Sequence, residues 1–165
     1  MKTPVYEMPL VTSAGKFTAR FSERGLAEIN FPSARRHAAG ASEFKIIPSG
    51  IRQWHRTTEM ALKSILAGRE PKKFPPLDLA GTEFQKKVWR ALRKIGPGRT
   101  KSYGEIARAI GKPKAVRAVG GACGANPVPV LVPCHRVLAA NGKIGGFSGG
   151  LDWKRDLLAR EGIKI

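Results

Sequence analysis

The sequence is poor in cysteine and in long apolar runs, and each shortage excludes a class of protein. Its two cysteines, Cys123 and Cys134, are too few for the disulfide framework of a small secreted domain. No apolar run approaches the ~20 residues that a membrane-spanning helix needs, so we expect no membrane partner. The first ten residues lack the apolar core and the small-residue cleavage site of a secretory signal, so we expect a cytoplasmic protein.

Acidic residues are also scarce, because 12 Asp and Glu accompany 30 Lys and Arg, for a net charge of +18. Between residues 86 and 117, eleven basic residues accompany a single acid, Glu105, for a local charge of +10. Such clustering is typical of proteins that bind a polyanion. Charge alone does not separate DNA from RNA or anionic lipid, and a solvated basic surface is an alternative, but the clustering favours nucleic acid.

The length fits one domain or two small lobes. Three prolines between positions 71 and 76 indicate a linker, which predicts lobes at 1–76 and 77–165. In the first lobe, apolar and polar residues alternate from residue 16 to residue 21 and an apolar-rich segment follows Gly25, which predicts an antiparallel hairpin. A mobile loop is expected over Ser33–Ser42, and apolar spacing predicts a helix from Thr58 to Gly68.

Two capping patterns predict helix starts in the second lobe. Thr82 and Gln85 have the spacing of a capping box and precede an apolar stripe that continues to Ile95. Ser102 and Glu105 repeat the pattern at the start of a second helix.

The helix that begins after Ser102 should stop at Gly111, and a further helix is expected from Ala115 to Gly121 or slightly beyond. Together they predict a helix-turn-helix, and the basic setting, which includes Lys114, favours DNA binding. Small residues at 115, 118 and 122 would allow close approach to a narrow groove, although tight helix packing explains the same spacing.

The most informative stretch is Pro133 to Val137, which sets a candidate nucleophile, Cys134, beside a candidate base, His135. Val128, Val130 and Val132 alternate with other residues just before it, which predicts a short buried extended segment. A neighbouring imidazole is one arrangement that lowers a thiol pKa. Neighbours in a strand point in opposite directions, so a catalytic pair requires a bend here; an inert buried cysteine is the alternative.

These motifs resemble the O6-alkylguanine-DNA alkyltransferases, and the resemblance covers the second half of the chain in the family's order and spacing. It implies an α+β protein with a small N-terminal antiparallel-sheet lobe and a mostly helical C-terminal lobe that carries the helix-turn-helix and the active-site cysteine. Its motifs are Gly81 to Gln85, Val88 and Trp89, Ser102 and Tyr103, Arg117 to Gly120, Asn126 and Pro127, Pro133 to Val137, and Gly149 and Gly150.

The resemblance implies a suicide DNA-repair protein. It would flip an O6-alkylguanine out of duplex DNA, approached from the minor groove, and move the alkyl group irreversibly onto its own cysteine, one molecule acting once; O4-alkylthymine would be a second substrate. No cofactor and no metal are expected. The resemblance also implies a monomer and leaves cooperative binding on DNA open.

Site residues are carried over by the resemblance, position by position. Cys134 is the nucleophile, His135 the base acting through a water, Glu161 the acid that orients it, and Asn126 the residue that holds the turn. Arg117 is the finger that fills the vacated stack, and Tyr103 crowds the neighbouring phosphate and later reaches the guanine. Substrate contacts fall on Val137, Ser148, Phe147, Cys123 and Gly149, and further DNA contacts on Ser102, Lys114, Ala115 and Ala118.

Two departures and two alternatives accompany this interpretation. Phe147 stands where relatives often have tyrosine, so a hydroxyl contact is absent, and no cysteine precedes position 123, so the zinc of some relatives is not expected. A non-enzymatic module that only binds alkylated DNA is one alternative, although known examples lack the cysteine. An unrelated cysteine hydrolase is the other, but it leaves Arg117, Tyr103 and the basic helices unexplained.

Overall fold

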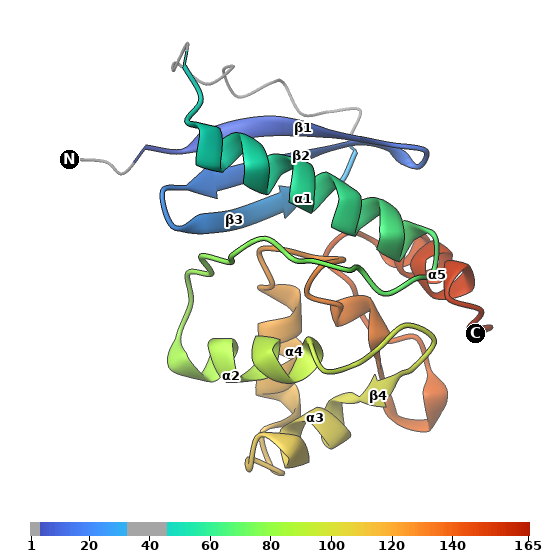
Figure 1. Cartoon of the computed structure of the whole chain (residues 1–165). Helices are drawn as coiled ribbons and strands as arrows, with labels where there is room; N and C mark the ends of the chain where they lie inside the picture. Colours follow the sequence, from blue (N-terminus) through green and yellow to red (C-terminus); the bar gives the residue numbers. More distant parts are fainter. Residues whose placement is uncertain (1–3, 33–45) are drawn as a thin grey trace.

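The computed structural model describes residues 4–32 and 46–165, so the loop expected at Ser33–Ser42 lies outside the described residues. A three-stranded antiparallel sheet comes first, with α1 (Ser49–Leu66) lying across one face (Figure 1). The mostly helical remainder packs beneath it, which confirms the α+β class. The sheet strands are β1 (Tyr6–Thr12), β2 (Gly15–Ser22) and β3 (Gly25–Asn30). The other elements are α2 (Glu83–Leu92), β4 (Lys101–Ser102), α3 (Tyr103–Ala109), α4 (Val116–Gly124), η1 (Cys134–Arg136), β5 (Val137–Leu138), η2 (Ala140–Gly142) and α5 (Leu151–Arg160).

The predicted hairpin is confirmed as β2 and β3, and the sequence analysis missed the strand β1 before it. Phe17, Ala19 and Phe21 of β2 are fully buried, as their alternation indicates. Proline argues against a central strand, but β1 is an edge strand and tolerates Pro9 opposite Thr18. His55 of α1 donates from Nε2 to the Pro9 carbonyl at 2.6 Å, so it is a structural contact between the helix and the sheet.

The first-lobe helix begins nine residues earlier than predicted, at Ser49 instead of Thr58. Ile51 is buried and Trp54 packs against the core, so the apolar stripe continues N-terminally at helical spacing. Polar residues around Ile51 and Trp54 make the helical spacing of the apolar residues hard to recognise in the sequence. At its other end the helix stops just before Gly68, as predicted.

Both capping boxes are confirmed in the second lobe. The Thr82 hydroxyl accepts from Gln85 N at 3.1 Å and Thr82 N donates to the Gln85 side chain at 2.9 Å; Ser102 and Glu105 make the same pair of bonds. The helix α2 ends at Leu92, so Ile95 lies beyond it in a buried turn. The predicted pair of helices is present as α3 and α4.

The extended segment predicted over Val128–Val132 is wrong, because the chain forms a compact turn there. Val130 has φ 74°, and Pro129 and Val132 make a bridge only three residues apart. Leu131 is buried along with the valines, so both sides of the segment face the interior and the alternation does not mark a strand.

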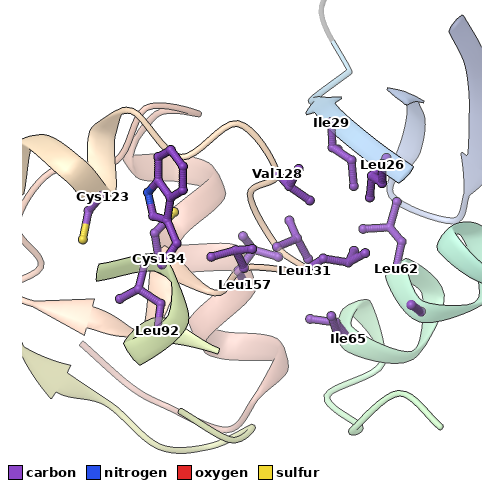
Figure 2. Packing of buried hydrophobic residues seen from close by; sticks show 14 of the residues in the cluster. Leu26, Ile29, Leu62, Ile65, Leu92, Cys123, Val128, Leu131, Cys134 and Leu157 are labelled. Atoms are coloured by element: carbon purple, nitrogen blue, oxygen red, sulfur yellow. The ribbon is translucent and has the colours of Figure 1, made fainter. Parts of the chain in front are cut away.

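One apolar core runs through both lobes. Figure 2 follows it from Leu26 and Ile29 of β3 past Val128 and Leu131 to Cys134. Backbone bonds reinforce the contact, because Ile29 N donates to the Pro127 carbonyl at 2.9 Å. The turn that leads to Cys134 therefore rests directly on the sheet. The boundary between residues 76 and 77 stays a prediction.

Candidate active site

The turn before Cys134 is held by one buried amide. Asn126 donates from Nδ2 to the Val132 carbonyl at 2.8 Å, and its Oδ1 accepts from Val128 N at 3.0 Å. A single side chain thus fastens both ends of the turn. Cys134 then opens the 3-10 turn η1, which is the bend that a catalytic Cys-His pair requires.

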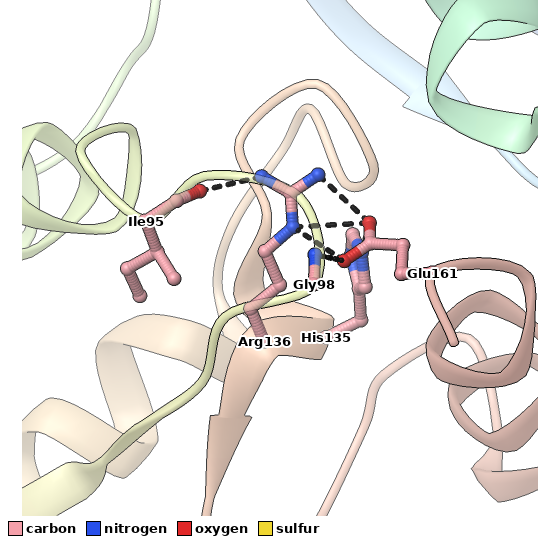
Figure 3. Close-up of polar contacts among 5 residues, drawn as sticks. All are labelled: Ile95, Gly98, His135, Arg136 and Glu161. Carbon is pink, nitrogen blue, oxygen red and sulfur yellow. Dashed lines mark hydrogen bonds and ion pairs between the residues drawn. The ribbon is translucent and has the colours of Figure 1, made fainter. Parts of the chain in front are cut away.

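A buried acid lies against the imidazole. His135 Nε2 is 3.0 Å from Glu161 Oε1, and the two side chains are 0% and 1% exposed (Figure 3). Glu161 caps the C-terminus of α5, so the fold brings together residues 26 positions apart. If Nε2 carries the proton that Glu161 accepts, Nδ1 holds the free lone pair. That atom is buried without a hydrogen-bond partner in the described chain, and it can therefore act as a base.

Arg136 is a member of this network that the sequence analysis did not single out. Its Nε lies 3.0 Å from both Glu161 oxygens, its Nη2 lies 2.7 Å from Oε1, and its Nη1 donates to the Ile95 carbonyl. Gly98 N donates to the same carboxylate at 3.1 Å. Burial alone would raise the pKa of Glu161, but the hydrogen bonds from His135 and Arg136 outweigh it and lower that pKa to about 2.

The resting thiol is not activated by its neighbour. Burial raises the pKa of Cys134 above its ordinary value, although hydrogen bonding from Asn126 and the charge of Lys154 oppose the rise. Burial likewise lowers the pKa of His135, although the hydrogen bond to Glu161 and the charge of that carboxylate act to raise it. Both shifts favour the neutral forms, a thiol at Cys134 and an imidazole at His135, in the resting protein.

Lys154 is the second residue that the sequence analysis missed. It is fully buried in α5, and its ammonium donates to the carbonyls of Val137 at 2.7 Å and Gly146 at 2.9 Å. Burial lowers its pKa, while the sulfurs of Cys134 and Cys123 act in the opposite direction. A signal exists in the sequence, because Lys154 precedes Leu157 and Leu158 by three and four residues and so lies on the buried stripe of the helix.

Two further expected residues lie by the thiol. Tyr103 starts α3, half-buried, and its hydroxyl donates to the Gly146 carbonyl at 3.5 Å. Cys123 is buried on α4, and burial together with the nearby Cys134 raises its pKa to about 12. The expected place of Cys123 beside the base pocket stays a prediction.

Four of the expected substrate residues follow η1 in the chain. Val137 is fully buried in β5, Phe147 and Gly149 are half-buried, and Ser148 is exposed. The Phe147 ring packs edge-on against Phe31, with centroids 5.7 Å apart. Lys154 joins the carbonyls of Val137 and Gly146, but contact between the expected residues and a base stays a prediction.

Most of the expected DNA-contacting residues lie at the start of α4, and Ser102 lies at the start of α3. Lys114, Arg117 and Ala118 are exposed and Ala115 is half-buried, while Ser102 caps α3. Ala122 is different: it is buried, and its carbonyl accepts the Trp89 indole N–H at 2.8 Å. The idea of one continuous small-residue face is therefore wrong at Ala122, where tight helix packing is the explanation.

Residues 4–32 and 46–165 contain neither a cluster of metal-ligating side chains nor a helix able to span a membrane. Within those ranges, no three His, Cys, Asp or Glu side chains gather as a metal site would require. The helices described there are also too short or too polar to cross a membrane.

Comparisons with known proteins agree on one family. The protein-family sequence model described as "6-O-methylguanine DNA methyltransferase, DNA binding domain" matches residues 83–163. A methylated-DNA–protein-cysteine methyltransferase of Methanosarcina acetivorans is 42% identical over 161 residues, 96% of each chain. One of the same name from Mycolicibacterium paratuberculosis is 61% identical over 85 residues, so that match spans about half, 52%, of each chain.

Solved structures point to the same family. The crystal structure of Mycobacterium tuberculosis OGT in complex with DNA has a TM-score of 0.73 and 36% identity, covering 94% of this chain and 92% of that one. An O6-methylguanine DNA methyltransferase from Methanococcus jannaschii has a TM-score of 0.68 and 31% identity, covering 96% and 95%.

Proposed function

The chain belongs to the 6-O-methylguanine DNA methyltransferase family, and from this membership we propose that it repairs DNA by moving an alkyl group from O6-alkylguanine to its own Cys134. The observation that carries the proposal is the buried His135–Glu161 hydrogen bond, made by the residue that directly follows Cys134 in the turn η1. It supplies an oriented base with a free Nδ1 next to the one cysteine that sits in a catalytic turn.

The chemistry is an in-line displacement at the alkyl carbon. The Cys134 proton passes through a water to His135 Nδ1, and Glu161 stabilises the imidazolium because it remains ionised. The thiolate sulfur forms a bond to the alkyl carbon, the carbon–O6 bond breaks, and its electron pair stays on guanine, which takes up a proton from water while His135 returns its own to solvent. A hydrogen bond from Tyr103 and contacts with the backbone at Val137 and Ser148 stabilise the leaving base.

A thioether has no carbonyl for water to attack, so each molecule acts once. The protein is then a stoichiometric reagent and not a turnover catalyst. O4-alkylthymine presents the same alkyl–oxygen bond beside a ring nitrogen, and we propose it as a second substrate.

Access to O6 requires that the nucleotide leave the stack. We propose that α4 enters the minor groove, where Ala115 and Ala118 allow close approach to the DNA. Lys114 and Ser102 contact the phosphate backbone of the DNA. Arg117 fills the vacated space, which its exposed position supports. The protein would act as a monomer on duplex DNA in the cytoplasm.

Intact-protein mass spectrometry tests the proposal. Incubation with a duplex that contains O6-methylguanine should add the mass of one methyl group to the native chain and to a Cys123→Ala variant, and none to a Cys134→Ala variant. Tight binding without a mass gain would instead support a module that only recognises alkylated DNA. A gain that persists without Cys134 would refute the assignment of the nucleophile.

A further inference from the structure

The loop at residues 146–149 carries Phe147 and Ser148, and we call it the base loop. Within the described chain, both of its polar links to other elements end on Gly146, whose carbonyl accepts from Lys154 at 2.9 Å and from Tyr103 at 3.5 Å. A third bond, from Gly150 N to the Phe147 carbonyl at 3.1 Å, only closes the turn itself. Hydrogen bonds therefore fix the beginning of the base loop, and packing has to fix the rest.

That packing comes from the first lobe. The Phe31 ring, directly after β3, meets the Phe147 ring edge-on at 5.7 Å and 75°. It also lies against Gly149, where an added Cβ would be 2.6 Å from Phe31 Cε2 and 2.9 Å from Phe147 Cε1. One ring of the first lobe thus touches two successive parts of the base loop.

Phe31 is itself held firmly. Its ring centroid lies 5.4 Å from that of Phe17, which is fully buried in β2, and 4.9 Å from that of Trp153 at the start of α5. Next to the contact, an open cavity of about 570 Å³ is lined by residues of both lobes, including Phe31, Ser148, Gly149 and Trp153. Because this space is open, the base loop has few other side chains to rest on here.

We propose that Phe31 is a positioning residue, which sets the place of Phe147 and Ser148 against the base and so makes the first lobe part of base recognition. The inference rests on the proposed function, since it takes the base loop as the guanine-binding wall. The ring contacts of Phe31 in the described chain are with Phe17, Phe147 and Trp153 and not with the residues around the thiol, so the chemistry at Cys134 does not depend on Phe31.

The test compares base binding with thiol reactivity in the full chain. The rate of alkyl transfer is measured against the concentration of O6-benzylguanine as free base, and the Cys134 thiol is separately titrated with iodoacetamide. Phe31→Leu should raise the half-saturating concentration by roughly two- to tenfold, the equivalent of one aromatic pair. The maximal rate and the iodoacetamide rate should stay within about twofold of native, since an aromatic pair remote from the sulfur does not alter it.

Two controls separate positioning from stability. Phe31→Tyr keeps the ring and should restore native behaviour. Phe17→Leu disturbs the same aromatic cluster without touching the base loop, so it should lower the melting temperature and shift half-saturation clearly less than Phe31→Leu does. Equal shifts from Phe17→Leu and Phe31→Leu would overturn the proposal, as would an unchanged half-saturation in Phe31→Leu.

Gly149→Ala approaches the same contact from the other side and leaves the core intact. Its methyl group would collide with the Phe31 ring, so half-saturation should rise, and the rise should be smaller when Phe31→Leu is also present. Purely additive effects would contradict the contact. A native chain that transfers no alkyl group from base or DNA would refute the proposed function, whereas normal transfer with unshifted variants would refute only the role of Phe31.

Discussion

Replacing Glu161 by glutamine should destabilise the protein strongly at neutral pH. The carboxylate is 1% exposed and accepts bonds from Arg136, His135 and Gly98 N, so the variant leaves the Arg136 charge buried without its counter-charge. Breaking a buried ion pair in this way costs about 3–5 kcal/mol. The pKa of Glu161 leads to a similar figure, since lowering it from 4.5 to about 2, at roughly 1.4 kcal/mol per pKa unit, corresponds to on the order of 3 kcal/mol.

The stability lost in Glu161→Gln should depend on pH, and the lowered pKa of Glu161 fixes the direction of that dependence. A carboxyl whose pKa is lowered by folding adds stability above its unfolded pKa, and that stability disappears as the pH falls through the folded value. The free-energy difference between native chain and Glu161→Gln should therefore be constant near neutrality and shrink from about pH 4.5 towards about pH 2. Urea unfolding followed by tryptophan fluorescence at a series of pH values measures it.

Asp156→Asn on the same helix is the matched control. Its carboxylate pairs with Arg160 at 2.7 Å, but the side chains are 45% and 32% exposed, so the loss should stay below about 1 kcal/mol. A Glu161→Gln loss as small as that of the control, or one that does not diminish in acid, would refute the reasoning about the buried network.

Three further predictions concern DNA, the thiol and a helix cap. Arg117→Ala should slow reaction with a methylated duplex far more than reaction with the free base, in parallel rate assays; equal losses would exclude a finger role. Lys154→Met should raise the pKa of Cys134, because it removes a cation that favours the thiolate, and Lys154→Arg should not; the pH profile of iodoacetamide labelling measures this, and superimposable profiles would contradict it. Thr82→Ala should lower the urea-derived unfolding free energy by about 1 kcal/mol through loss of the capping box, and no change would contradict that.

Local rules explain what could be predicted of the fold. The starts of α2 and α3 followed from Thr82 and Ser102, because a capping box involves only residues three positions apart. The strand β1 could not be predicted in the same way, since Pro9 is acceptable only at the edge of a sheet. The alternating valines before Cys134 predicted an extended segment, which is wrong. Asn126 closes a turn there, and both sides of the chain are buried, so the alternation does not indicate a strand.

The candidate site likewise contains residues that local sequence reveals and residues whose role only the folded chain reveals. Cys134 and His135 are visible in the sequence because they are neighbours, and Glu161 could be placed only through the family resemblance. The roles of Arg136 and Lys154 were missed, since a charged side chain is expected at the surface unless partners compensate its burial. Those partners include backbone carbonyls of Ile95 and Gly146, which only the folded chain brings into reach.

The most direct test of the account is the stoichiometry of repair together with the location of the transferred group. With methylated duplex in large excess, the account predicts one repaired guanine per protein molecule and a peptide map in which the methyl group is found on Cys134 alone. Continued repair beyond one equivalent, or a methyl group on any other residue, would contradict it.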